Sequence, residues 1–530
     1  MVKWNFPGNQ YGQIKGVADA GIENFNGTEL ASLARENCQN SLDAALDDTN
    51  PQVLVEFERY FVSVDKIPGM IEYREILRQC KLFWEKSKSE KAKTFLKNAV
   101  SKANEKNGFV LRISDYNTTG LSDPYADSSD AFNFKFDGWN ALIKIDGGAN
   151  KDGDKAGAFG IGKSAPFSNS FYRLVFYRTL NQDNERASQG ISRLMSYPDG
   201  RNMTSGVGYF GNPNGNNPVE SINELEVLNK RSETGTDVFV FGFKANSDWE
   251  NEIITALLEN FLMSIYNGQL RVKVQNSEIN SGTLDGYMER VHREYPGPTK
   301  GTYGNYLCLI RTEDVKTYSK DFHGLGTLQL RILVDPNEKL DRKVLIVRKA
   351  GMKLFRLGNI SKLVPFTGIL ELKGKALNNY FRSMETVAHD NWEPGRHADP
   401  KQAKMYYEEI KEWIRSIVAE LAEHTSDDEM DVEGLSGVLQ CEQEMVETGD
   451  SDNKRENLND YLGNIDIIKR PERTPSKGFF YGKGDEGSAE STSTKGTLGS
   501  IGDPGLRILK GKRKRKKLDS HRGLPDPEGK

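Results

Sequence analysis

Residues 29–45 read ELASLARENCQNSLDAA, and this stretch decides how the N-terminal half of the chain is interpreted. Its spacing of apolar residues predicts a helix, and Thr28 stands where an N-cap is expected. At about 100° per residue, Asn40 lies roughly 40° from Glu36, and Asp43 lies roughly 20° to the other side. The three polar side chains therefore form one narrow stripe. A solvated helix face is the simplest interpretation of such a stripe.

A buried strand is predicted further along the chain, at the apolar run Phe109–Ile113. Asp115 follows it closely, and Asn117 and Gly120 come next. A carboxylate at the end of a buried strand can accept a hydrogen bond from a ligand amine, and small residues after it let a ligand approach the backbone. An Asx turn without any ligand is the alternative.

The third feature is a glycine-rich segment, GAFGIGKS, at residues 157–164. Its glycines leave backbone N–H groups accessible and its lysine adds positive charge, and both suit phosphate. A flexible hairpin loop is the alternative. The segment also matches the pattern GxxxxGK[ST], but a P-loop follows a buried strand directly. Residues 147–156, GGANKDGDKA, contain no apolar strand, so the match is interpreted as a coincidence.

The order of these parts resembles the GHKL ATPases, which include gyrase, MutL, heat-shock chaperones, MORC proteins and histidine kinases. The resemblance covers roughly residues 24–243 and includes Gly235-Thr236 at the start of a strand. The stretches LARENCQNSLDAA and GAFGIGKSAPF look closest to the bacterial MORC- and MutL-like ATP-binding proteins of defence systems. The cofactors that this resemblance implies are ATP and Mg²⁺.

The resemblance also implies a role for each residue of the helical stripe. Glu36 would be the general base that activates the attacking water, and Asn40 would ligate Mg²⁺. Asp43 would support the nucleotide site from the same helix face. All three must face one ligand, which agrees with their placement on one stripe.

The remaining site residues follow from the same resemblance. Asp115 would accept from the adenine amino group, and Thr236 would reach that region through its hydroxyl or a water. Asn117 stands where the family has its first glycine, and Gly120 comes one residue late. Asn tolerates the left-handed backbone, so this turn is feasible. The lid over the phosphates would consist of Gly157, Gly160, Gly162, Lys163 and Ser164.

The chain as a whole is predicted to be α+β. Residues 1–278 are expected to form a GHKL-type α/β sandwich (the Bergerat fold) with an N-terminal arm. Residues 279–373 are expected to form a β-rich α/β domain that resembles a transducer domain, with either Lys349 or Lys353, if any lysine, reaching the γ-phosphate. Residues 374–449 are interpreted as a helical segment. Residues 450–530 are too polar to offset the entropy of ordering and are predicted to be a disordered basic tail.

Several individual elements are also predicted. Residues 71–104 favour two helices, and Trp249–Tyr266 favours one. The apolar runs of the second domain are expected to be strands, at Tyr306–Ile310, Thr327–Val334, Lys343–Arg348 and Phe366–Lys373.

Composition limits the classes of function. Lys and Arg number 72 and Asp and Glu number 76, so the net charge is −4 and any nucleic-acid-binding patch must be local. Such a patch exists in Lys510–Lys517, where seven of eight residues are basic. No run approaches the ~18 apolar residues of a membrane helix. The four cysteines are far apart, which argues against a disulfide framework, and a cytoplasmic location is expected.

Two functions remain after these exclusions. The first is an ATP-operated switch that closes its lid and forms a homodimer with ATP, and whose partner is DNA or an effector subunit. The second is a chaperone of the same fold that acts on protein clients. A histidine kinase is disfavoured because no histidine precedes His292.

A candidate metal site is also present in the sequence. Its spacing can bind a metal through Glu385, His389, Asp390 and Glu393, but a structural His–Asp contact at a helix end is the alternative.

Overall fold

The computed structural model describes residues 2–47, 50–126, 134–146, 162–200, 202–348, 350–386 and 391–425. All of them belong to one compact unit, Met1–Val438. The predicted disordered tail lies outside the described residues. Within the described ranges, no helix combines the length and the apolar character that crossing a membrane requires.

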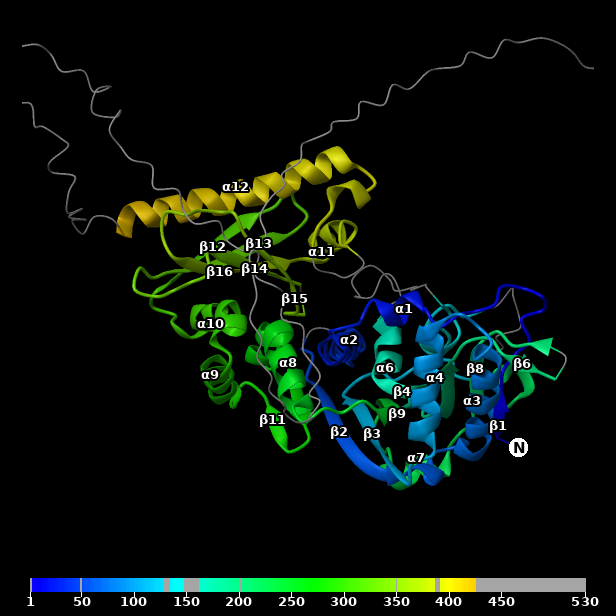
Figure 1. The fold of residues 1–530 in the computed structure, drawn as a ribbon. Coiled ribbons are helices and arrows are strands. Elements are labelled where there is room, and N and C mark those ends of the chain that lie inside the picture. Colours follow the sequence, from blue (N-terminus) through cyan, green and yellow to red (C-terminus); the bar gives the residue numbers. More distant parts are fainter. Residues whose placement is uncertain are drawn as a thin grey trace, which may run out of the picture. The chain divides into compact units, whose positions relative to one another are not determined.

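A mixed nine-stranded sheet forms the N-terminal part (Figure 1), in the order β1-β8-β5-β4-β9-β3-β2-β10-β11. The central strands β4, β9, β3 and β2 pair antiparallel, while β10 pairs parallel with β2. The strands are β1 (Lys3–Asn5), β2 (Val53–Ser63), β3 (Asn107–Tyr116), β4 (Ser170–Leu180), β5 (Arg186–Arg193), β8 (Val207–Gly211), β9 (Gly235–Phe243), β10 (Leu270–Val274) and β11 (Ser277–Ile279), with the small hairpin β6 (Pro198–Asp199) and β7 (Asn202–Met203) beside them.

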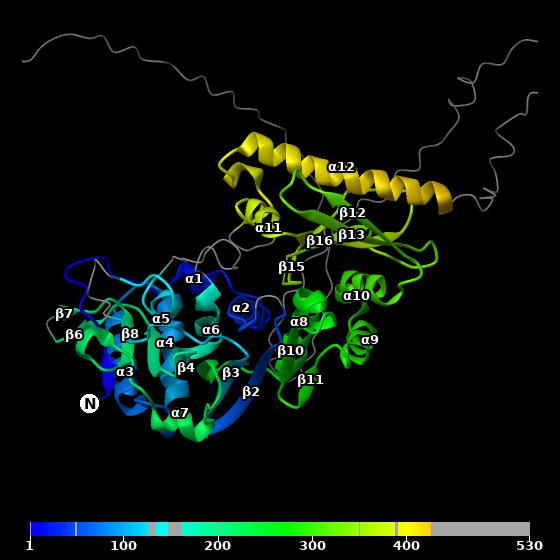
Figure 2. The ribbon, with the colours of Figure 1, turned by 180° about the vertical axis from the view of Figure 1, so that it is seen from behind.

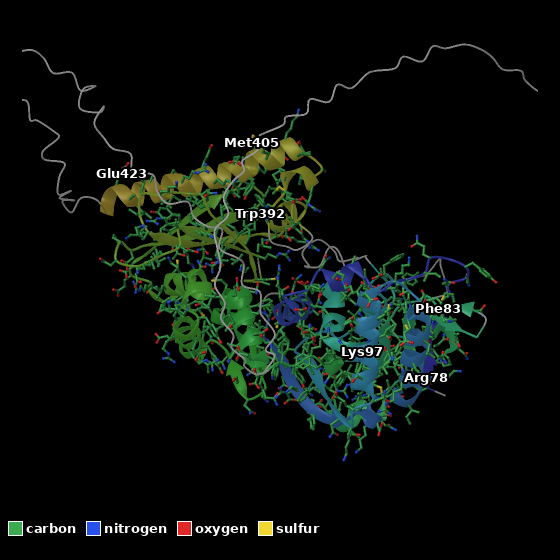
Figure 3. All side chains as sticks on the ribbon, in the orientation of Figure 1. Arg78, Phe83, Lys97, Trp392, Met405 and Glu423 are labelled. Atoms are coloured by element: carbon green, nitrogen blue, oxygen red, sulfur yellow. The ribbon has the colours of Figure 1, made fainter. Side chains whose placement is uncertain are left out.

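Helices cover both faces of this sheet because its central strands are apolar on both sides. Along β9, Val238 and Val240 belong to one core, and Phe239 and Phe241 belong to the other, as the two-residue period of a strand requires. The first core includes α2 (Glu29–Asp43) and α8 (Trp249–Tyr266). The second includes α3 (Met70–Trp84) and α4 (Glu90–Ala103). Charged side chains such as Arg78 and Lys97 stay on the outer surfaces of α3 and α4 (Figure 3).

The predicted helices and strands of this part are confirmed, including the two helices of residues 71–104 and the limits of Trp249–Tyr266. Two local details differ from expectation. Thr28 is the N-cap of α2, but its hydroxyl contacts Ser32 Oγ at 3.1 Å and makes no cap hydrogen bond. The start of the predicted arm pairs with β8 as strand β1, and Trp4 and Phe6 lie in the second core.

The second part is a five-stranded sheet in the order β12-β13-β16-β14-β15 (Figure 2). Its strands are β12 (Val315–Asp321), β13 (Thr327–Val334), β14 (Lys343–Val347), β15 (Lys353–Leu357) and β16 (Phe366–Lys373). Helix α12 (Pro400–Thr425) covers one face through Ile410 and Ile414, and Trp392 is buried in the same core (Figure 3). Helices α9 (Leu284–Glu294) and α10 (Pro296–Ile310) precede this sheet, and α11 (Lys375–Arg382) follows it.

The strand predicted at Tyr306–Ile310 is wrong, because these residues are the last turns of helix α10. A short buried apolar run cannot be assigned to strand or helix from its periodicity alone. The residues before it are rich in Gly and Pro, which are poor helix formers. Pro296, however, occupies the first turn of the helix, where proline is tolerated. Gly301 lets α10 approach β15 so closely that a Cβ there would collide with the Arg356 guanidinium.

The remaining short elements connect these layers. They are α1 (Ala20–Glu23), α5 (Gly138–Ile143), α6 (Ala165–Ser168) and α7 (Asn223–Leu228), and the 3-10 turns Val64–Lys66, Gly162–Ser164, Asn214–Asn216 and Pro394–Arg396.

Candidate functional site

Helix α2 presents the predicted polar stripe. Glu36 and Asp43 are half-buried and Asn40 is exposed, whereas Cys38 and Leu42 are buried in the core on another side of the helix. The division of this helix into a polar and an apolar face is therefore confirmed. Helix α8 packs beside α2, which fixes its position over the sheet (Figure 1).

The Asp115 side chain lies at the end of β3 and is held by donors from three elements. Its Oδ1 accepts from the Thr118 hydroxyl at 2.6 Å and from the Thr236 backbone N–H at 2.7 Å. Its Oδ2 lies 3.0 Å from the Ser41 hydroxyl of α2. A carboxylate offers about four acceptor positions, so capacity for a further donor remains at Oδ2.

Burial raises the pKa of Asp115, while the nearby Arg231 charge and the three donors act in the opposite direction. A carboxyl group with a perturbed pKa and a fixed orientation is typical of a binding site, although structural networks also produce it.

The turn after Asp115 has the left-handed backbone that Asn117 makes feasible. Asn117 adopts φ 60° and Gly120 adopts φ 68°, both in the left-handed region. A Cβ at residue 120 would meet the Leu180 carbonyl oxygen, so the late glycine is required by close packing. The turn is tied to the end of α2, because Thr119 N–H donates to the Ala44 carbonyl at 2.8 Å.

Thr236 meets Asp115 in a different way from the one expected. The resemblance implied contact through the hydroxyl or a water, and the structure shows the backbone N–H as donor. Gly235 precedes it at φ 140°, and a Cβ there would collide with the Asp115 carbonyl oxygen. No other residue fits this approach of β9 to β3 without strain.

The described part of the glycine-rich segment lies beside Glu36. A Cβ at residue 162 would collide with the Glu36 carboxylate, so Gly162 and Glu36 are in direct contact. Gly157 and Gly160 lie outside the described residues. The structure thus places the middle of α2 against this segment and its C-terminal end against the Asp115 turn.

Lys163 and Ser164 are both buried. The Lys163 ammonium donates to the carbonyl oxygens of Ala141 and Ile145, at the end of α5. Burial, followed by the Arg193 charge, lowers the pKa of Lys163 to about 8. The Ser164 hydroxyl accepts from Arg193 Nη1 at 2.9 Å.

The candidate transducer lysine Lys353 pairs with Glu259 of α8, and Lys349 lies outside the described residues. Burial lowers the pKa of Lys353, and the Glu259 charge opposes this shift. The turn before Lys353 is fixed on the same helix, since the Ser264 hydroxyl donates to the Ala350 carbonyl.

The alternative metal site is only partly visible. His389 and Asp390 lie outside the described residues, and Glu385 forms an ion pair with Arg348. No group of three or more His, Cys, Asp or Glu side chains within the described ranges is arranged to hold a metal ion.

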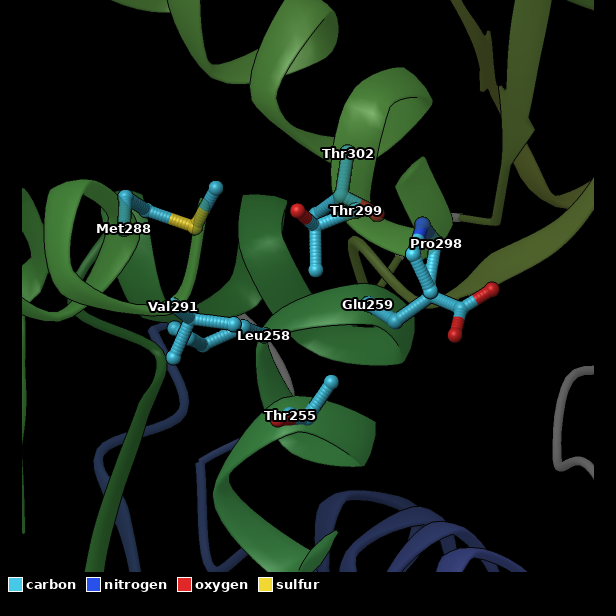
Figure 4. Close-up of a pocket in the computed structure, with 8 residues that line it drawn as sticks. All are labelled: Thr255, Leu258, Glu259, Met288, Val291, Pro298, Thr299 and Thr302. Carbon is cyan, nitrogen blue, oxygen red and sulfur yellow. The ribbon is translucent and has the colours of Figure 1, made fainter. Parts of the chain in front are cut away.

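A small hollow lies among α8, α9 and α10 (Figure 4). Leu258, Met288 and Val291 line its apolar side, and Glu259 is the only acidic residue in its lining. None of the predicted site residues lines it, so it is separate from the Asp115 region.

Sequence reasoning missed a buried ionic cluster under the Asp115 turn. Asp237 accepts from Arg178 at 2.7 Å and from Arg231 Nη2 at 2.7 Å, and Ser114 Oγ donates to it at 2.5 Å. Arg231 lies in a polar loop, where it resembles any solvated arginine. Only the pairing of β9 with β3 and β4 brings these residues together, so no local signal could have found them.

This cluster predicts a specific acid response. Burial alone would raise the pKa of Asp237, but hydrogen bonds and charges from Arg231 and Arg178 outweigh it and lower the pKa to about 2. The unfolded value is 3.8, so the folded state gains stability above pH 4 and loses it as the pH falls through 2. Urea unfolding should show this loss, about 2 kcal/mol between pH 4 and 2 at ~1.4 kcal/mol per pKa unit.

Asp237→Asn is the matched variant, because it removes the titrating group and keeps the shape of the side chain. Its free energy of unfolding should be lower at pH 7 and should fall less steeply between pH 4 and 2. An identical pH slope in both proteins would contradict the assignment.

A scan against protein-family models and a search of curated proteins return no match. Among solved structures, the chain is similar to the 43K ATPase domain of Thermus thermophilus gyrase B, crystallised with an aminocoumarin. The identity is 11% and the TM-score 0.32, over 79% of this chain and 98% of that one.

A second similar structure is the ATP-binding domain of Francisella tularensis topoisomerase IV in complex with a small-molecule inhibitor. The identity is 9% and the TM-score 0.31, over 80% of this chain and 98% of that one.

Proposed function

We propose that the chain is an ATP-binding and slowly ATP-hydrolysing switch of the GHKL type. The observation that carries this proposal is that α2 connects two loops of suitable chemistry. Ser41 of this helix contacts the Asp115 carboxylate, and Glu36, about 7.5 Å earlier along the axis, contacts Gly162. One helix thus supports a base-binding carboxylate near its C-terminal end and a phosphate-binding segment at its middle.

At the base end, the Asp115 carboxylate accepts a hydrogen bond from the adenine amino group. Its three donors hold it in one orientation, so it enters the interaction without reorganisation. Guanine has a carbonyl oxygen where adenine has this amine, so Asp115 disfavours GTP.

At the phosphate end, Glu36 takes a proton from the attacking water. Asn40 offers an amide oxygen, a ligand type that Mg²⁺ accepts, and its exposure on the stripe fits this role. Mg²⁺ supplies charge neutralisation of the phosphate oxygens when it is bound. Asp43 supports the site from the next turn, and Gly162, Lys163 and Ser164 contribute to the lid together with Gly157 and Gly160.

Nucleotide binding is proposed to close the lid and to join two subunits. Lys163 would then exchange the carbonyl oxygens of Ala141 and Ile145 for phosphate oxygens, which a cationic ammonium prefers. The partner of the switch is proposed to be DNA or an effector subunit of a defence system.

The full chain tests this proposal by light scattering after chromatography, with and without a non-hydrolysable ATP analogue and Mg²⁺. The measured mass should double with the ATP analogue. With a non-hydrolysable GTP analogue it should stay at the value of the monomer. The measurement is repeated with duplex DNA, which should co-elute with the dimer. Absence of ATP binding in calorimetry would reject the proposal.

The basic segment Lys510–Lys517 predicts how DNA binding depends on salt. These seven charges belong to a chain whose remainder has a net charge of −4 − 7 = −11. Each phosphate contact contributes a slope of ~0.9 in log K against log salt. Replacing the segment with Gly and Ser of equal length should weaken DNA binding and flatten this slope by several units.

ATP hydrolysis without DNA should barely change in this variant, because the segment is outside every nucleotide-binding motif. An unchanged DNA affinity and salt slope would assign the segment to solubility alone.

A further inference from the structure

A row of buried polar side chains crosses three strands beneath the Asp115 turn. Arg178 of β4, Asp237 of β9 and Ser114 of β3 are direct neighbours in the strand register. All three are buried, and Arg231 completes the row from the loop before β9. Side chains alternate along a strand, so this row lies on the face of β3 opposite to the Asp115 carboxylate.

Arg231 donates hydrogen bonds from all three of its guanidinium nitrogens. Its Nε and Nη2 bind the two oxygens of Asp237 at 2.8 and 2.7 Å. Its Nη1 donates to the Glu233 carbonyl at 3.0 Å. The guanidinium also lies 4.9 Å from the centre of the Tyr116 ring. A guanidinium held at so many points has one orientation.

The remaining contacts of Arg231 are to the candidate base site. Nη2 donates to the backbone carbonyl of Asp115 at 2.9 Å and to that of Thr236 at 3.1 Å. The paired residues of β3 and β9 end at Ser114 and Asp237, which is one pair before Asp115 and Thr236 would face each other. Arg231 therefore joins the two strands at the point where their own hydrogen bonds stop.

The space around this contact is filled. A Cβ at residue 235 would lie 2.7 Å from Arg231 Nη1 as well as colliding with the Asp115 backbone. The position of the Asp115 backbone, and with it the direction of the carboxylate, thus depends on the guanidinium behind it.

We propose that Arg231 is a positioning residue for base recognition, and that it sets the affinity and the adenine selectivity of the site through the backbone of Asp115 and Thr236. This inference rests on the proposed function. Arg231 contacts no nucleotide in this scheme. It acts by holding the Asp115 carboxylate in the orientation in which Oδ1 accepts from the Thr236 N–H and Oδ2 faces the adenine amine.

The chemistry of the side chain explains why arginine is needed. Only a guanidinium can bind both oxygens of Asp237 and reach two carbonyls with one planar group. Lysine keeps the charge, but its three N–H donors leave from a single nitrogen, so it cannot bind the two oxygens of Asp237 side by side and also span to both carbonyls. Glutamine keeps neither the charge nor the fork.

The test compares Arg231→Gln and Arg231→Lys with a matched buried arginine, Arg112→Gln. Arg112 lies on β3, is equally buried, and pairs with Glu56 and Glu58 at 3.0 and 2.6 Å. Neither glutamate has a hydrogen bond to Asp115 or Thr236 among the described contacts. The measurements are the Kd for ATP and GTP by calorimetry, kcat and KM for ATP, and the melting temperature.

Arg231→Gln should raise the Kd and the KM for ATP on the order of ten-fold, the effect of one lost buried polar contact. The ratio of GTP to ATP affinity should shift toward one, while kcat at saturating ATP stays within about two-fold. Arg231→Lys should recover part of the affinity. Arg112→Gln should lower the melting temperature by a similar amount and keep the ATP Kd and the selectivity of the wild type.

Equal Kd and selectivity in Arg231→Gln and Arg112→Gln would overturn the inference, because Arg231 would then act on stability alone. A parallel fall of kcat in Arg231→Gln would also overturn it. If the wild type binds no ATP, the proposed function fails first, and the inference fails with it.

Discussion

Glu36→Ala is expected to bind ATP with nearly the affinity of the wild type and to lose hydrolysis. A general base acts on the attacking water, whereas affinity depends on the adenine and phosphate contacts. Loss of a positioned base typically reduces the rate ~10²–10⁴-fold. The Glu36 carboxylate is half-buried and lies against Gly162, so removal of the side chain leaves the Asp115 end of α2 unchanged. Phosphate release and calorimetric ATP binding measure the two properties separately.

Glu75→Ala is the control for this variant, because Glu75 is an exposed helical glutamate whose contacts within the described ranges are with neighbours on α3. It should hydrolyse ATP at the wild-type rate. Wild-type hydrolysis in Glu36→Ala would show that another group activates the water.

The local parts of the site could be predicted because short-range patterns determine them. The apolar spacing of residues 29–45 predicted both the helix and its polar face, and Phe109–Ile113 predicted the buried strand that delivers Asp115. Asn117 made a left-handed turn after this strand feasible, and the structure has one there. In each case, one element of the chain contains the whole signal.

The parts that were missed depend on residues far apart in the sequence. The contact of Arg231 with Asp115 spans 116 positions. The strand order that makes it possible, β4-β9-β3, is a property of the folded sheet. The helical nature of Tyr306–Ile310 is likewise decided by packing of α10 on β16, and its local sequence fits a strand equally well.

Lys163 shows a further limit of sequence patterns. The glycine-rich segment predicted a lysine near phosphate, and the structure places its ammonium on two carbonyl oxygens of the α5 region. The pattern identifies the residue type and the loop, but a side chain with four rotatable bonds can serve two partners in turn. Its role toward phosphate stays a prediction.

Asp115→Asn is expected to fold like the wild type and to bind ATP ~5–150-fold more weakly, the range given by ~1–3 kcal/mol for an unpaired buried polar group. The Ser41 hydroxyl explains why the fold survives. It lies 2.9 Å from the Asn37 carbonyl and 3.0 Å from Asp115 Oδ2, and its one proton can serve only one of them. With an amide at residue 115, the hydroxyl can donate to Asn37 and accept from the new NH₂ group, so no buried atom loses its partner.

The same exchange removes the acceptor that adenine needs. The amide oxygen stays with Thr118 and Thr236, and the NH₂ group points where the carboxylate oxygen was, so it meets the adenine amine donor to donor. Calorimetry with ATP and GTP measures this, with the exposed Asp314→Asn as control and the melting temperature as the check on folding. Wild-type protein should bind GTP poorly. Equal affinity of the wild type for ATP and GTP would show that Asp115 does not recognise the base. Unchanged ATP affinity in Asp115→Asn would lead to the same conclusion.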